Sequence, residues 1–148
     1  MVKDIHPEFL TDANGVLFFG GSGNLWKSDG SEDGTVVVKN ISPWIGYSVD
    51  ERISNPIAIN GVLFLAADDW THGTELWKSD GTEAGTVMVA DINPGVDEYG
   101  YGLSSNPAWL TDVNGTLFFF ADDGEHGREL WAYKFITSRL YMPMLLIQ

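Results

Sequence analysis

The feature that most constrains this chain is a motif that recurs with its turn residues in place. The complete copy is Glu75-Leu-Trp-Lys-Ser-Asp-Gly-Thr-Glu-Ala-Gly-Thr86, and an earlier copy runs without a gap as Leu25-Trp-Lys-Ser-Asp-Gly-Ser-Glu-Asp-Gly-Thr35. A third copy begins as Arg128-Glu-Leu-Trp131 and then departs. Apolar residues flank a turn that has Gly where a positive φ is needed and Asp where a side chain can cap. Each copy therefore predicts a β-hairpin.

A second hairpin signal recurs in step with the first. Three Asn-Gly pairs each precede an apolar run: Asn14-Gly-Val-Leu-Phe-Phe19, Asn60-Gly-Val-Leu-Phe-Leu65 and Asn114-Gly-Thr-Leu-Phe-Phe119. Asn-Gly favours a type I′ turn, because both residues tolerate a positive φ. Each unit is thus four strands joined as two hairpins, with a period of about 50 residues, which is typical of a β-propeller blade. The predicted blades are 7–41, 55–92 and 106–147.

The predicted strands indicate that both faces of each sheet are covered. Leu117-Phe-Phe-Phe120 is apolar on successive residues rather than on alternate ones, and no long helical periodicity competes with the strand pattern. Blades stacked face to face provide such cover. The expected fold is therefore all-β, with three four-stranded antiparallel blades.

These motifs resemble the ELWxxDGT repeat family of bacterial proteins, which are usually described as secreted or surface-associated. The resemblance covers roughly residues 7–131 and includes the spacer Leu110-Thr-Asp-Val-Asn-Gly-Thr-Leu-Phe-Phe119. It implies a repeat fold of propeller type and transfers no catalytic residue or ligand. It also suggests export, whereas residues 1–5 lack the features of a signal peptide, so the localisation stays open.

Several function classes find no support in the sequence. The formal net charge of −13 disfavours nucleic acid as a partner, and no apolar run is long enough for a membrane-spanning helix. There is no cysteine, no Gly-x-Ser-x-Gly elbow and no phosphate-binding glycine loop. A carboxylate pair for glycoside hydrolysis cannot be chosen among 21 acidic residues without coordinates. The chain is therefore expected not to be an enzyme.

The linkers between blades carry the candidate ligand-binding residues. Four aromatic side chains lie there among Gly, Pro and acidic residues: Trp44, Tyr47, Tyr99 and Tyr101. Aromatic rings and carboxylates together suit a sugar or a protein ligand. The alternative is that these rings pack over blade edges without contacting a ligand.

Two acidic loops carry the candidate metal ligands. Asp68-Asp-Trp-Thr-His-Gly73 and Asp122-Asp-Gly-Glu-His-Gly127 place paired carboxylates ahead of a His. Asp68, Asp69, Asp122 and Asp123 could bind Ca²⁺, although no cofactor is required. Alternatively, these side chains cap backbone groups of a turn. The matching loop of the first blade, residues 20–24, lacks both Asp and His, which favours capping.

Three blades are fewer than a propeller needs to close, and they would leave two open sheet faces with large apolar areas. The tail at 140–147 is expected to supply the last strand of the third blade; a strand donated by residues 2–5 and a tail unrelated to the repeat are alternatives. Two copies of the chain would give six blades around a two-fold axis, so we predict a homodimer. A fragment of a longer array is the alternative. The expected function is a scaffold or interaction module, and the alternative is a carbohydrate-binding or glycan-processing propeller.

Overall fold

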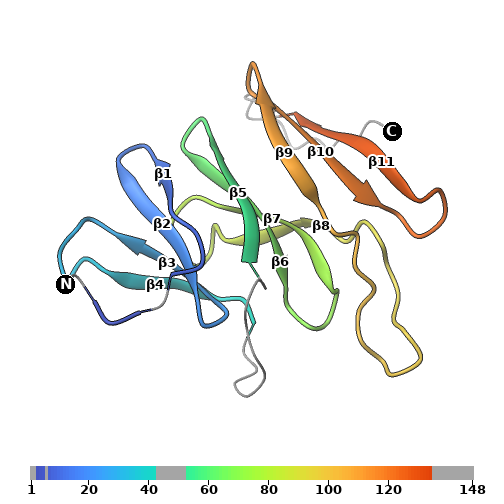
Figure 1. The fold of residues 1–148 in the computed structure, drawn as a ribbon, viewed down its shortest axis with the longest axis horizontal. Coiled ribbons are helices and arrows are strands. Elements are labelled where there is room, and N and C mark those ends of the chain that lie inside the picture. The colour runs from blue at the N-terminus through green and yellow to red at the C-terminus, as the bar shows by residue number, and fades with distance from the viewer. Residues whose placement is uncertain (1–2, 6, 43–52, 135–148) are drawn as a thin grey trace.

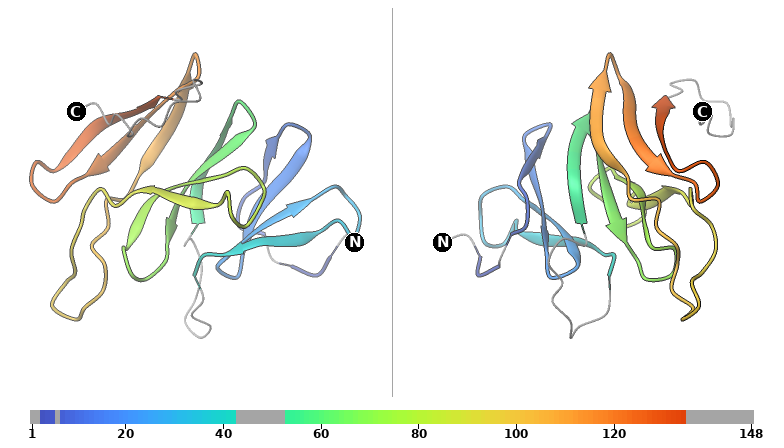
Figure 2. Two further views of the ribbon diagram at one scale, coloured as in Figure 1. Left: turned by 180° about the vertical axis from the view of Figure 1, so that it is seen from behind. Right: turned by 45° about the vertical axis from the view of Figure 1, so that its right-hand side comes forward.

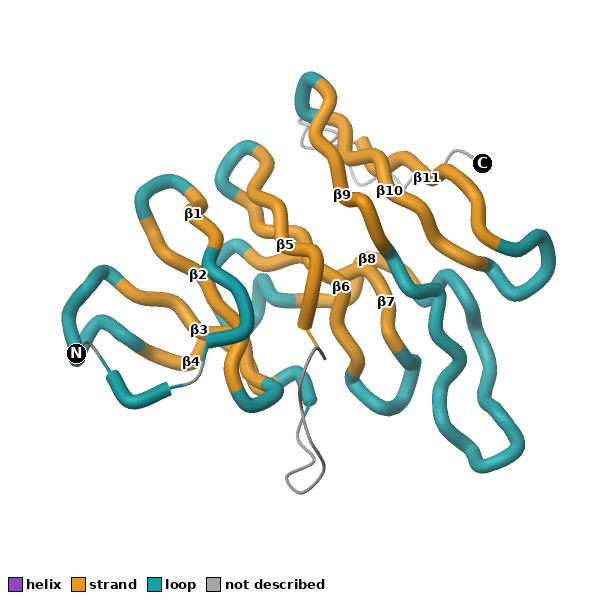
Figure 3. The backbone as a smooth tube through the Cα atoms, viewed as in Figure 1, coloured by secondary structure: helices purple, strands orange, loops and turns teal. Residues whose placement is uncertain are grey.

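β-Strands dominate the computed structural model, which describes residues 3–5, 7–42 and 53–134. These ranges contain strands and no helix, and Figure 3 shows strands joined by loops alone. The strands form three antiparallel sheets that follow one another in chain order (Figure 1). The expected all-β class is therefore confirmed. The predicted strand at 140–147 lies outside the described residues.

The first two sheets each contain four strands joined as consecutive hairpins. The first sheet holds β1 (Thr11–Ala13), β2 (Val16–Gly21), β3 (Asn24–Ser28) and β4 (Val36–Asn40). The second holds β5 (Ile53–Ile59), β6 (Val62–Asp68), β7 (Thr74–Ser79) and β8 (Val87–Ala90). In the third sheet the described strands are β9 (Ala108–Val113), β10 (Thr116–Asp122) and β11 (Arg128–Lys134).

The Asn-Gly pairs form the turns that the sequence predicts. Asn14 and Gly15 connect β1 to β2 with φ values of 55° and 78°. Positive φ at both residues also occurs at the pairs starting at Asn60 and Asn114. A type I′ turn needs this combination, and it matches the right-handed twist of the two strands that it joins.

The Ser-Asp-Gly turns are held by one repeated set of hydrogen bonds. Oδ1 of Asp80 accepts the backbone N–H of Thr82 at 2.9 Å and its hydroxyl at 2.7 Å, and Oγ1 of Thr82 accepts the N–H of Gly85 at 2.9 Å. A Cβ on Gly85 would collide with the Asp80 carboxylate, so the turn requires glycine there. Asp29 organises the earlier turn in the same way.

The second sheet lies between the other two and is covered on both faces (Figure 2). Its strand β5 contacts both β1 and β9. Along β6, Leu63 and Leu65 belong to the core shared with the first sheet, whereas Phe64 belongs to the core shared with the third. All three side chains are fully buried. Cover on both faces, expected from the uninterrupted apolar runs, is therefore confirmed for this sheet.

Each sheet has two faces that can be named by the neighbour they meet. We call the face toward the following sheet the forward face. The forward face carries Ala13, Phe18 and Leu25 in the first sheet, and Ile59, Phe64 and Leu76 in the second sheet. We call the face toward the preceding sheet the backward face. The backward face carries Leu63, Leu65, Ala67 and Trp77 in the second sheet. In the third sheet it carries Leu117, Phe119, Ala121 and Trp131.

A buried glutamate joins the second sheet to the start of the third. The Glu75 side chain is completely buried, and its carboxyl oxygens accept the N–H of Ile92 at 3.0 Å, the N–H of Ser105 at 2.9 Å and the hydroxyl of Ser105 at 2.6 Å. Burial raises the pKa of this carboxyl group despite these hydrogen bonds. Glu75 therefore fixes both ends of the β8–β9 linker.

Replacing Glu75 by Gln should destabilise the fold by about 1–3 kcal/mol, because the amide nitrogen cannot accept a buried N–H. Glu129, which occupies the matching position in the third sheet, is half-buried and makes none of these hydrogen bonds to the residues that the structure describes. Glu129→Gln should therefore change stability by less than about 0.5 kcal/mol. Urea unfolding of the two variants measures both values. Equal effects would contradict the role assigned to Glu75.

Candidate functional site

The loops that carry the predicted site residues lie at one end of the sheets. The β6–β7 loop, the β8–β9 linker and the β10–β11 loop all lie at the end opposite the Asn-Gly turns (Figure 1). The N–H of Thr74, just after the first of these loops, donates to Oγ of Ser104 at 2.9 Å. Asn93 lies against Gly124 of the third. The structure therefore brings these three loops into one loop surface, defined as residues 69–73, 91–107 and 123–127.

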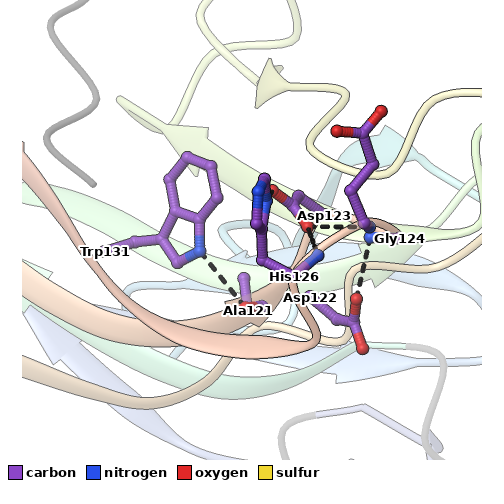
Figure 4. Close-up of polar contacts among 7 residues, drawn as sticks. Ala121, Asp122, Asp123, Gly124, His126 and Trp131 are labelled. Carbon is purple, nitrogen blue, oxygen red and sulfur yellow. Dashed lines mark hydrogen bonds and ion pairs between the residues drawn. The ribbon is translucent and has the colours of Figure 1, made fainter.

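Two acidic turns on this surface share one geometry. In the β10–β11 loop, Oδ1 of Asp123 accepts the N–H groups of Glu125 and His126 at 2.9 and 2.8 Å, and Oδ2 lies 2.8 Å from Nδ1 of His126 (Figure 4). Asp69 contacts the backbone of Thr71 and His72 and the His72 ring in the same way. Each carboxylate thus organises a turn and orients an imidazole.

The pKa values of these pairs move as an ion pair requires. The hydrogen bond that the His126 ring makes to the Asp123 carboxylate raises the pKa of His126. The hydrogen bonds that Asp123 accepts from the ring and backbone of His126 lower the pKa of Asp123. The bond to Asp69 likewise raises the pKa of His72. Burial opposes ionisation of Asp69, but hydrogen bonds from His72 outweigh it and lower the Asp69 pKa. Each ion pair is complete when its imidazole is protonated.

The first aspartate of each predicted metal pair also accepts from a turn. Oδ1 of Asp68 accepts the N–H of Trp70 at 2.7 Å, and Oδ1 of Asp122 accepts the N–H of Gly124 at 2.8 Å (Figure 4). Among residues 3–5, 7–42 and 53–134, no group of three or more His, Asp or Glu side chains gathers in a way that could hold a metal ion. The Ca²⁺ site at Asp68, Asp69, Asp122 and Asp123 stays a prediction, and these contacts favour the capping interpretation.

Two of the predicted ligand-binding rings lie exposed on the loop surface. The Tyr99 side chain is 77% exposed and that of Tyr101 is 53% exposed. The Tyr101 ring also lies against Trp70, with 6.0 Å between ring centroids. Trp44 and Tyr47 lie outside the described residues. The surface therefore offers an aromatic patch that is partly supported by the neighbouring acidic turn.

The tip of the β8–β9 linker has an internal structure of its own. Val96 and Gly102 form a β-bridge, and Oδ1 of Asp97 accepts the N–H groups of Tyr99 at 2.8 Å and Tyr101 at 3.0 Å. The N–H of Leu103 donates to the Gly95 carbonyl at 3.1 Å. These bonds fix the backbone that presents the two tyrosines. The sequence indicated a loop here, but it gave no sign of this bridge.

The third sheet presents an apolar surface of the kind that the sequence predicted for the open ends of a three-blade unit, without naming its residues. Leu130 is 55% exposed and Val113 is 48% exposed, whereas their counterparts on the other forward faces, Leu25, Leu76 and Ile59, are buried. Phe118 and Phe120 lie beside them, and Trp109 is 75% exposed. Comparing equivalent positions of the three predicted blades would have located this surface, because an open end leaves one forward face uncovered.

Comparisons with protein-family models, with curated proteins and with solved structures found no match. The resemblance to ELWxxDGT repeats therefore rests on the motif residues alone. Within the described part of the chain, no helix has the length and apolar character to cross a membrane.

Asp123→Asn should lower the pKa of His126 toward its usual value of about 6.5 and leave His72 unchanged. The amide oxygen can still accept the N–H groups of the turn, so the substitution removes the charge and keeps the cap. Because the raised pKa belongs to the folded state, this pair stabilises the fold below about pH 6.5 and loses that effect as pH rises through the raised pKa. NMR titration of the imidazole protons measures both pKa values. An unchanged His126 pKa would contradict the pairing.

Proposed function

We propose that this protein is a non-catalytic, propeller-type interaction or scaffold module, in which each sheet acts as one blade and two chains form a homodimer of half-rings. One observation carries the proposal: the third sheet exposes, on its forward face, the positions that are buried in the first two sheets. Propellers close with about four to eight blades, so three blades leave two uncovered ends. Two copies supply six.

The loop surface supports binding rather than catalysis. Its Asp carboxylates accept from the turn backbone and contact the histidine rings, so these side chains act as turn caps. The exposed tyrosines are the side chains best placed to contact a partner.

Coupled folding and dimerisation would make stability depend on concentration. A tenfold dilution should lower the unfolding free energy by about 1.4 kcal/mol per dimer, because dissociation accompanies unfolding. Urea titrations at two protein concentrations test this. A midpoint that does not move with concentration would contradict an assembly in which folding depends on the second chain.

A second candidate is binding of a carbohydrate at the loop surface. Tyr99 and Tyr101 present aromatic faces. Asp97 and Glu98 come directly before Tyr99 in the sequence. Sugar rings stack on aromatic faces, while carboxylates accept hydrogen bonds from sugar hydroxyl groups. This candidate and the scaffold function are compatible, because the loops and the sheet faces are separate surfaces.

A glycan array tests the carbohydrate candidate. Binding of a defined glycan should weaken at least about fivefold in Tyr99→Ala, since loss of a central aromatic contact costs more than about 1 kcal/mol. Val96→Ala, another exposed linker residue, should leave binding unchanged. The absence of any bound glycan would sink the candidate. A rise in Tm with added Ca²⁺ would instead support the metal site at the acidic loops.

A further inference from the structure

Two contacts mark the packing of one sheet on the next: an Asn–Gly contact at both junctions, and a Phe–Gly contact between the first and second sheets. At the Asn-Gly turns, the side chain of Asn14 lies over Gly61 of the second sheet, and that of Asn60 lies over Gly115 of the third. A Cβ added to Gly115 would lie 3.2 Å from Nδ2 of Asn60. The preceding sheet therefore places an asparagine against the turn glycine of the following sheet at both junctions.

In the second contact, an aromatic ring of the first sheet packs on the Ser-Asp-Gly turn of the second sheet. A Cβ added to Gly81 would lie 3.1 Å from Cζ of Phe18, so the Phe18 ring closes over this glycine. The Lys27 ammonium donates to the carbonyl of Gly81 at 2.9 Å beside it. Glycine at this position thus provides the space that the forward-face phenylalanine of the preceding sheet occupies.

The first sheet has both turn glycines, but no atom of the described residues packs against either one. Gly15 and Gly30 are the counterparts of Gly61 and Gly81, and nothing lies within 4 Å of a Cβ added at either one. Gly30 borders an apolar groove of about 180 Å³ on the backward face. Its lining includes Leu10, Leu17 and Phe19, together with Ile5 and Pro7 of the N-terminal segment, which lies along one side of the groove.

The third sheet carries the matching side chains at the other end of the chain. Asn114 and Phe118 are the counterparts of Asn14 and Phe18, and Leu130 beside them is 55% exposed. The second sheet separates the two ends, so they cannot meet within one chain (Figure 2). A second copy can bring them together.

Resting on the half-ring assembly proposed above, we infer that the forward face of the third sheet docks onto the backward face of the first sheet of a second copy. Phe118 closes over Gly30, and Asn114 lies against Gly15. This pairing repeats the packing of the first sheet on the second, and its Asn–Gly part is present at both junctions within the chain. A two-fold axis forms the pairing twice in a closed dimer. A symmetric contact between two third sheets would not repeat it, because Gly115 already lies against Asn60.

Charge substitution at each face tests this pairing. Leu130→Glu alters the forward face of the third sheet, and Leu10→Glu, at a side chain 64% exposed, alters the groove of the first sheet. Val96→Glu, at 60% exposure on the loop surface, is the matched control. All three side chains are exposed, so each variant should fold, which circular dichroism verifies.

Sedimentation equilibrium gives the dimer dissociation constant of each variant. Both face variants should raise it by roughly a thousandfold, because each weakens two contacts by about thirtyfold. Val96→Glu should leave it unchanged. A one-to-one mixture of the two face variants should associate more tightly than either alone. The mixed dimer retains one unaltered contact, and the two substitutions in its other contact disrupt the same interaction, so their effects do not add in full.

Two results separate the inference from the assembly on which it rests. A wild-type dimer that Leu130→Glu dissociates and Leu10→Glu does not would overturn the pairing of these faces and preserve the dimer. It would point to contact between two third sheets or to another surface of the partner. A wild-type monomer at all concentrations would overturn both the pairing and the half-ring assembly.

Discussion

The structure depends on burying both faces of each antiparallel sheet. A sheet whose strands are apolar on successive residues cannot leave either face in water, because each Å² of apolar surface buried contributes about 25 cal/mol. The second sheet meets this constraint within the chain, and Leu63, Phe64 and Leu65 are fully buried on alternating sides. Among the described residues, the first and third sheets each pack one face on the second sheet. Their remaining faces define what the molecule can bind.

The sequence predicts the local parts of this arrangement well. The turn residues specify the Asn14-Gly15 turn and its two counterparts, because positive φ depends on these residues themselves. β5 begins at Ile53, two residues before the predicted start of the blade at 55. This earlier start depends on a register shift near Asn55, whose φ is 51°. The role of Glu75 depends on Ser105, which lies 30 residues away. Patterns of neighbouring residues do not encode such contacts.

The candidate site shows the same division. The spacing of Asp and His predicted either a metal loop or a capped turn, and the contacts around Asp69 and Asp123 are those of a capped turn. The composition of the linker identified Tyr99 and Tyr101, but their exposure depends on the bridge and on Asp97, which composition does not show. The blade count predicted open apolar faces at the two ends, but the exposure of Leu130 was found only by comparison with its buried counterparts.

The central claim is that the chain completes its stacking with a second copy of itself. Light scattering after gel filtration measures the absolute mass of the protein in solution and tests this claim most directly. We expect twice the 16.3 kDa of the chain. A mass of 16.3 kDa across the accessible concentration range would contradict the account.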